Sequence, residues 1–194
     1  GMGLRRVRIT GGEPLIRRDL PDLIRKISAI PEIEDLSLST NAVLLADQAQ
    51  DLRDAGIQRL NISLDSLQQD RVDEIARRPG SFPKIFEGLE AAERVGFSPI
   101  KVNVVLIRGR NDDEIEDFAR ITKERPWHIR FIEVMPTGSN LDLSANSFVS
   151  CQEALARVRA IDQLEPVDGP FGNGPADYYR FPGAPGTVGV ITPM

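Results

Sequence analysis

Residues 7–20 read VRITGGEPLIRRDL, and this stretch opens with an alternating apolar and polar pattern. Val7 and Ile9 are separated by polar residues, which is the period-two pattern of a β-strand with one apolar face. Gly11 and Gly12 then follow, where glycine permits unusual dihedral angles and lets another group approach the backbone closely. The stretch predicts a strand, a turn and a helix. We expect the two glycines to expose backbone groups to a ligand.

Composition limits the classes of protein that the chain can belong to. It has 194 residues, of which 41% are hydrophobic and 27% charged, as in an ordinary soluble globular chain. No apolar run is long enough to cross a bilayer, so we expect no membrane association. The net charge of -5 argues against a broad nucleic-acid surface, although it allows a local cationic pocket.

The sequence contains one cysteine, Cys151, and one histidine, His128. A single cysteine forms no internal disulfide, which is typical of an intracellular protein, so we expect a cytoplasmic location. Two such residues cannot supply a zinc site or an iron–sulfur cluster, so no metal ligand is expected on this chain. His128 lies in a strand pattern, and we interpret it as a structural residue.

Strand patterns alternate with helical patterns along most of the chain. Strands are expected at 5–10, 35–40, 58–65, 100–107 and 127–135. Between them, Asp47 and Asn111 are expected to cap helices, and Gly56 and Gly96 to end helices. Strands that alternate with helices predict an α/β fold with a parallel sheet, either a (β/α) barrel or a doubly wound sheet.

The pattern changes after residue 137. A loop, a helix at 148–159 and short antiparallel strands at 164–167, 178–181 and 187–191 are expected there. We therefore expect a body at 1–136 and a C-terminal extension at 137–194.

Four of the expected strands pair an apolar face with a polar face. Helices carry matching apolar stripes, so they cover the apolar face, and the polar face points into the barrel. Burying an unpaired polar group costs about 2–7 kcal/mol, so this interior should hold water or a ligand. An excess of cations favours an anion such as phosphate. The polar set is Arg6, Arg8, Thr10, Ser37, Ser39, Asn61, Ser63, Asp65, Lys101 and Asn103.

Five motifs in this order, ITGGEPLIRRDL, LSTNAVLL, LNISLDSL, KVNVVLIRGRND and FIEVMPTG, resemble the family of molybdenum cofactor biosynthesis protein A. These proteins are radical S-adenosylmethionine GTP 3',8-cyclases. The resemblance runs to the late segment GPADYYRFPGAPGTVGVITPM and implies an incomplete (β/α)₆ barrel of the TIM type. It also implies two [4Fe–4S] clusters in the full-length protein, and a next enzyme of molybdopterin synthesis that receives the product.

The resemblance assigns ligand roles residue by residue. It implies that Gly12, Glu13, Ser63 and Met135 bind S-adenosylmethionine. It implies that Arg8, Ser39, Lys101 and Arg130 bind GTP. Arg130 and Met135 fall on opposite faces of an ideal strand, so both roles require an irregularity or the strand end between them.

The resemblance also implies a mechanism. Reductive cleavage of S-adenosylmethionine gives a radical that abstracts hydrogen from ribose C3' of GTP, and the ribose radical attacks guanine C8. The product would be (8S)-3',8-cyclo-7,8-dihydroguanosine 5'-triphosphate. The family's cluster cysteines precede GGEP and follow VITPM, and Cys151 matches neither set. We expect an internal piece of the enzyme that performs no radical chemistry alone, with an open edge at its first strand that permits a homodimer.

Three other interpretations of the sequence stay open. A different radical S-adenosylmethionine enzyme, such as a peptide-maturing one, would share GGEP without needing Lys101 or Arg130. A non-enzymatic protein could retain only nucleotide binding, and the single cysteine is the best argument for it. An aldolase-type phosphate barrel is a weaker alternative, because no lysine and acid pair indicates Schiff-base chemistry.

Overall fold

The computed structural model describes residues 3–77, 79–134, 147–167 and 176–192. The chain forms two compact units, one made of residues up to Ser63 with Gln68–Ile100, the other of Leu64–Leu67 with the residues from Lys101 onward. Strands and helices alternate along the chain, and most of the described strand pairs are parallel, so the predicted α/β class is confirmed. An incomplete barrel is consistent with this arrangement. The predicted division after residue 136 stays a prediction.

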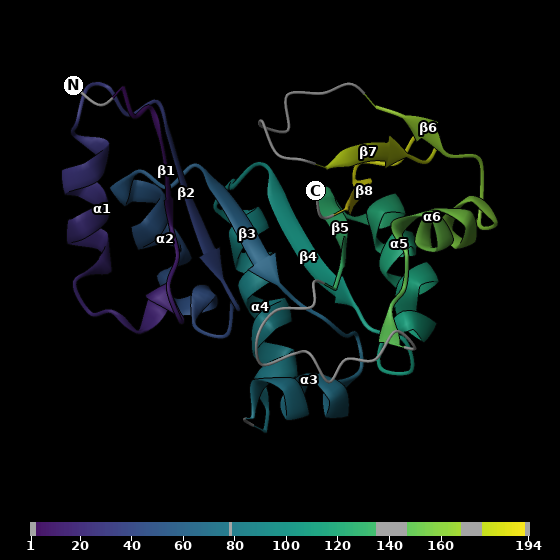
Figure 1. Ribbon diagram of the computed structural model, residues 1–194. Coiled ribbons are helices and arrows are strands. Elements are labelled where there is room, and N and C mark those ends of the chain that lie inside the picture. Colours follow the sequence, from purple (N-terminus) through teal and green to yellow (C-terminus); the bar gives the residue numbers. More distant parts are fainter. Residues whose placement is uncertain (1–2, 78, 135–146, 168–175, 193–194) are drawn as a thin grey trace. The chain divides into compact units, whose positions relative to one another are not determined.

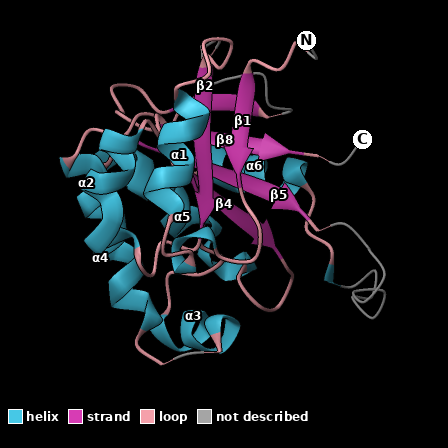
Figure 2. Ribbon diagram, turned by 90° about the vertical axis from the view of Figure 1, so that its left-hand side faces the viewer, coloured by secondary structure: helices cyan, strands magenta, loops and turns pink. Residues whose placement is uncertain are grey.

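The first unit is a three-stranded parallel arrangement with its helices. Its strands pair in the order β1, β2, β3. Figure 2 shows α1 and α2 along the same side of β1 and β2. The elements are β1 (Arg6–Ile9), the 3₁₀ helix η1 (Pro14–Ile16), α1 (Leu20–Ser28), β2 (Asp35–Thr40), α2 (Leu45–Ala55), β3 (Arg59–Ser63), α3 (Gln69–Ala76) and α4 (Ser81–Arg94).

The core of this unit lies between the strands and α2 and α4. Leu38 and Ile62, on the apolar faces of β2 and β3, are fully buried. Each such side chain contributes roughly 1.5–3 kcal/mol by leaving water. Gly88 permits close packing of α4, because a Cβ there would lie 2.6 Å from the carbonyl oxygen of Ala42.

The second unit contains the remaining helices and strands. Its strands follow the order β4, β5, β8, β7, β6. Figure 1 shows α5 and α6 beside β5. The elements are β4 (Ile100–Leu106), η2 (Asp112–Glu114), α5 (Ile115–Glu124), β5 (Trp127–Glu133), α6 (Cys151–Arg159), β6 (Glu165–Pro166), β7 (Asp177–Arg180) and β8 (Thr187–Ile191). In the described part of the chain, no helix combines the length and the apolar character that a membrane span requires.

The late strands differ from the expectation in one respect. β7 pairs antiparallel with both β6 and β8, as predicted. β8, however, pairs parallel with β5, so the C-terminal segment extends the sheet of the second unit. Its apolar residues Val188 and Val190 are buried, and this burial favours pairing with the core strand β5.

One helix cap was predicted wrongly, because Asp47 lies in the first turn of α2 and the N-cap is Leu44. Asn111 is the N-cap residue of η2, as predicted, but its side chain makes no capping bond. Its Oδ1 accepts from Ile107 N at 2.8 Å, and its Nδ2 donates to the carbonyl oxygens of Asp65 and Val105. The side chain of Asn111 therefore fixes the loop after β4, because three backbone groups need partners there.

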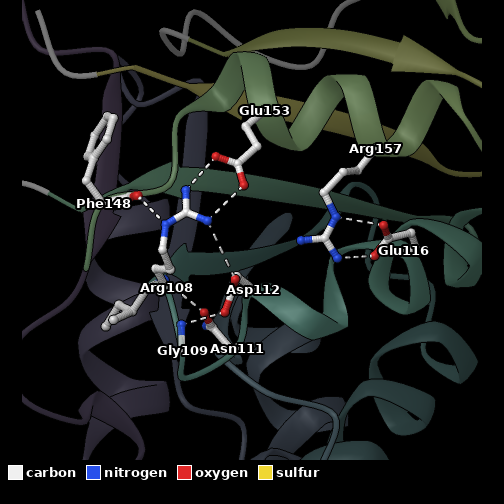
Figure 3. A network of polar contacts seen from close by, with 9 residues as sticks. Arg108, Gly109, Asn111, Asp112, Glu116, Phe148, Glu153 and Arg157 are labelled. Atoms are coloured by element: carbon white, nitrogen blue, oxygen red, sulfur yellow. Dashed lines mark hydrogen bonds and ion pairs between the residues drawn. The ribbon is translucent and has the colours of Figure 1, made fainter. Parts of the chain in front are cut away.

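Arginine–carboxylate pairs attach α6 to the loop after β4 and to α5, as Figure 3 shows. Arg108 Nη2 donates to Glu153 at 2.6 Å, and its Nε donates to the carbonyl oxygen of Phe148. Arg157 forms a two-bond pair with Glu116, with Nε to Oε1 at 2.7 Å. This pair is less exposed than the Arg108 pair, so solvent screens it less.

We predict that Glu116→Gln destabilises the protein more at pH 7 than at pH 3. The guanidinium of Arg157 lowers the pKa of Glu116, so the carboxylate stabilises the fold above its ordinary pKa, and this contribution is lost as the pH falls through the lowered value. A two-bond pair of this exposure contributes about 1 kcal/mol at neutral pH.

Urea unfolding at the two pH values measures this effect, with Glu124→Gln as the exposed control on the same helix. A loss of stability that is equal at both pH values, or equal to that of the control, would contradict the assignment.

Candidate functional site

The loop after β1 places two exposed glycines where the strand ends. Gly11 has φ +150°, a conformation that other residues rarely adopt, so the turn itself requires glycine. Gly12 is different, because its φ is not in that region and a Cβ there would meet no atom within 4 Å. Neither backbone conformation nor packing within the described chain requires glycine at position 12. Open space beside Gly12 fits the close approach of a ligand.

Glu13 is held by the protein itself. Its Oε1 accepts from Thr40 Oγ1 at 2.6 Å and from Leu15 N at 3.1 Å, and its Oε2 accepts from Asn41 N at 2.8 Å. Sequence reasoning expected this carboxylate to accept from a ligand. The structure gives it a positioning function, because it ties the loop after β1 to the end of β2.

The polar face of the first unit contains Arg8, Ser39 and Ser63. Arg8 pairs with Ser37 in the parallel register, and Ser39 pairs with Asn61. Because side chains two residues apart point to the same face, Arg8, Ser39 and Ser63 share one face near the carboxyl ends of their strands. Arg8 and Ser63 are exposed and Ser39 is half-buried, so all three are accessible.

The polar face of the second unit begins with Lys101 and Asn103 on β4, and with His128 and Arg130 on β5. Arg130 Nε donates to Asn103 Oδ1 at 2.7 Å. Lys101 and Arg130 are each only 6% exposed, although they are charged. The opposite face of β5 is apolar, since the ring of Phe131 meets Phe118 of α5 edge-on at 6.4 Å. Buried cations on the face away from α5 are the strongest electrostatic feature of this unit.

β8 and β7 continue this polar face. His128 and Arg130 pair with Thr187 and Gly189, and Gly189 pairs with Tyr178 of β7. Gly189 provides space, because a Cβ there would lie 3.0 Å from the ring of Tyr178 and 3.2 Å from Arg130 Cγ. The sheet thus has a row through Arg130, Gly189 and Tyr178.

One residue away along the strands, a second row passes through His128 and Thr187. Continuing the register of β7 and β8 by one residue pair beyond Tyr179 and Val188 places Arg180 beside Thr187. Sequence reasoning missed this row. The alternation of Tyr178 with Arg180 and of Thr187 with Gly189 was the available signal.

His128 is a buried, neutral side chain in this cationic setting. Its Nδ1 lies 2.8 Å from Thr187 Oγ1, and it is 7% exposed. Burial first, and then the nearby charges of Lys101, Arg180 and Arg130, together lower its pKa to about 4. The interpretation of His128 as structural agrees with this contact.

Three other predicted positions have different outcomes. Asp65 lies beyond the end of β3, and its Oδ1 accepts from Val105 N at 2.8 Å, while burial raises its pKa. The Asp65 carboxylate therefore serves the backbone, contrary to its expected place on the ligand face. Met135 lies outside the described residues. Ser63 remains a candidate ligand contact, since it ends β3 with an exposed side chain.

Cys151 does not fit a cluster ligand. Its Sγ lies 3.4 Å from the carbonyl oxygen of Ile191, and its N–H donates to Glu133 Oε1 at 2.7 Å. Burial and the charge of Glu133 raise the pKa of this thiol to about 11, whereas metal ligation requires the thiolate. In the described residues, no group of three or more His, Cys, Asp and Glu side chains is arranged to hold a metal ion.

Comparison with known proteins gives a family match. The model of the radical SAM superfamily matches residues 1–121. The chain is 49% identical to a GTP 3',8-cyclase of Picosynechococcus sp., over 100% of the chain and 59% of that protein. It is 50% identical to a GTP 3',8-cyclase of Listeria monocytogenes, over 99% of the chain and 58% of that protein. The chain thus spans about three fifths of the length of these curated relatives.

Solved structures share the fold at low sequence identity. A domain of pyruvate-formate lyase-activating enzyme from Bacteroides vulgatus superposes with a TM-score of 0.62 at 17% identity, over 81% of the chain and 92% of that domain. A radical SAM methyltransferase from Sphaerobacter thermophilus gives a TM-score of 0.61 at 20% identity, over 96% of the chain and 51% of that protein. At such identities the likeness concerns the fold alone.

We predict that Glu13→Ala destabilises the first unit by about 1–3 kcal/mol, because Thr40 and the backbone N–H of Asn41 would lose their acceptor. Thermal unfolding measures the loss, with Glu32→Ala as an exposed control. Equal stability of the two variants would show that the three bonds to Glu13 contribute nothing.

We also predict that the histidine signal in the proton NMR spectrum titrates near pH 4. The folded pKa lies below the ordinary value of 6.5, so the neutral imidazole stabilises the fold at neutral pH. This contribution falls as the pH decreases from about 6.5 toward the folded pKa. Because His128 is the one histidine of the sequence, the assignment needs no variant. Titration near 6.5 would contradict its burial among cations.

Proposed function

Because the chain belongs to the radical SAM superfamily, we propose that it comes from a GTP 3',8-cyclase of molybdenum cofactor biosynthesis. Identity near 50% to proteins of that name supports this proposal. The structural observation that supports this proposal is the excess of cations on the polar strand faces. Lys101 and Arg130 are buried, and Arg8 lies at the strand ends of the other unit.

A nucleoside triphosphate suits these residues for a physical reason. Several cations gathered on one polar face attract a polyanion through the sum of their charges. Arginine binds phosphate oxygens through two parallel N–H donors, whereas lysine acts as a point charge. In the proposal, Arg8, Ser39, Lys101 and Arg130 contact GTP, and their function is to hold and orient it.

S-adenosylmethionine is the proposed cofactor at the loop after β1. Gly12 fits that function because its Cα borders open space, and Glu13 fits a positioning function because it fixes the loop. Ser63 and Met135 are further proposed contacts. The cofactor supplies the radical that begins the reaction, while the chain binds, orients and excludes water. The cyclised triphosphate would pass to the next enzyme of molybdopterin synthesis in the cytoplasm.

The single cysteine of the sequence is the argument for a second candidate, a protein that binds the nucleotide without cluster chemistry on this chain. The buried thiol with its raised pKa is unsuited to ligate iron. Both candidates predict nucleotide binding, and only the first predicts cyclase activity when the cluster ligands of the relatives are present.

We expect the chain to bind GTP more tightly than ATP and Arg8→Ala to weaken GTP binding roughly 10- to 100-fold, the usual effect of one charge-assisted contact. Arg5→Ala is the matched control, because Arg5 is exposed and pairs with Glu34. Isothermal titration calorimetry measures both variants. Equal binding of GTP and ATP would contradict the substrate, and equal affinities of the two variants would remove Arg8 from the site.

A further inference from the structure

Arg180 lies in β7, two strands away from β5 through β8, which is about 10 Å at the usual strand spacing. Its side chain has the parity of Tyr178, whose ring lies against Gly189 beside the stem of Arg130. Arg180 therefore shares the polar face of β5 and β8 that carries His128 and Arg130. Tyr179 has the opposite parity, and its ring meets the guanidinium of Arg159 at 5.5 Å.

The guanidinium of Arg180 is incompletely satisfied. Its Nε is buried and has no hydrogen-bond partner among the described residues. The side chain forms no ion pair with a carboxylate of the described residues. A buried donor without an acceptor costs about 1–3 kcal/mol, and the cost is greater for a charged group. A residue that serves only the fold would be expected to find an acceptor among its neighbours.

Other cations lie on the same face. The charges of Lys101, Arg130 and Arg180 all lower the pKa of His128. The imidazole of His128 lies on β5, the strand between β4 and β8, and contacts Thr187. Three cations around one neutral imidazole repel one another in a region of low exposure. An anion bound on this face would lower that repulsion and would also accept from the buried Nε of Arg180.

We propose that Arg180 is a further substrate-binding residue, which contacts a phosphate group on the face shared by His128 and Arg130. The inference rests on the proposed function, since it takes the triphosphate of GTP as the anion. Arg180 binds phosphate as a third cation beside Lys101 and Arg130. Gly189 has no side chain, so the ring of Tyr178 and the stem of Arg130 approach the strand that lies between theirs.

The test uses the full chain with inorganic tripolyphosphate and with GTP. His128 is the one histidine in the sequence, so its NMR signal reports the charge around it without any label. Tripolyphosphate should raise the pKa of His128 from about 4, because the bound anion offsets the neighbouring cations. Calorimetry should show that Arg180→Gln binds tripolyphosphate roughly tenfold or more weakly than the unmodified chain. Arg180→Lys should retain part of the affinity.

Arg159→Gln is the matched control, because Arg159 lies on the opposite face of β7 against Tyr179. The affinity of Arg159→Gln for tripolyphosphate should equal that of the unmodified chain. Arg180→Gln with unchanged affinity for tripolyphosphate overturns the inference. An unmodified chain whose His128 pKa does not respond to tripolyphosphate overturns it as well, and this readout needs no variant.

The outcome for GTP separates this inference from the proposed function. If tripolyphosphate binding depends on Arg180 while GTP and ATP bind equally, the inference on Arg180 stands and the GTP proposal fails. If GTP is preferred to ATP but Arg180→Gln binds both nucleotides as before, the GTP proposal stands and Arg180 has no part in binding.

Discussion

Side chains alternate between the two faces of a strand, so once helices cover the apolar face, the residues of alternate parity lie on the other face. In the first unit the buried face contains Leu38 and Ile62, and in the second it contains Phe131 against α5. Every polar residue of alternate parity must therefore lie on the opposite face. The cationic character of Arg8, Lys101 and Arg130 follows from their places in this alternation.

Burial explains why these cations indicate a ligand. Lys101 and Arg130 are almost fully buried, and a fold that needed only stability would place apolar residues at such positions. Arg130 Nε donates a hydrogen bond to Asn103 Oδ1 on the neighbouring strand. His128 stays neutral among the charges, which avoids a further positive charge on the face. The polar face of the second unit thus gathers positive charge at buried positions.

The sequence alone predicted the strands in which apolar and polar residues alternate clearly. Such an alternation, bounded by glycine, is compatible with few structures other than a β-strand. β2 begins and ends where the pattern predicted, and Gly56 ends α2 with φ +120°. The polar face was predicted for β1 to β4 for the same reason. What failed were short-range guesses about side-chain bonds, since Asn111 and Asp65 bind backbone groups that come close only in the folded chain.

The contribution of the late strands to the site could not be predicted, because it depends on pairing between residues far apart in the sequence. Thr187 reaches His128 only when β8 lies parallel to β5. Glu13 similarly needs the end of β2 beside it before its three donors meet. In both cases the local pattern gave the element, and the tertiary pairing gave the function of the side chain.

A crystal structure of the chain with bound GTP would test most directly whether the polar strand face binds the ligand. We predict phosphate oxygens on this face, within hydrogen-bond distance of Lys101 and Arg130. A triphosphate bound elsewhere, on the helices or along an outer edge, with these two side chains unchanged, would contradict the claim that the polar strand face is the ligand face.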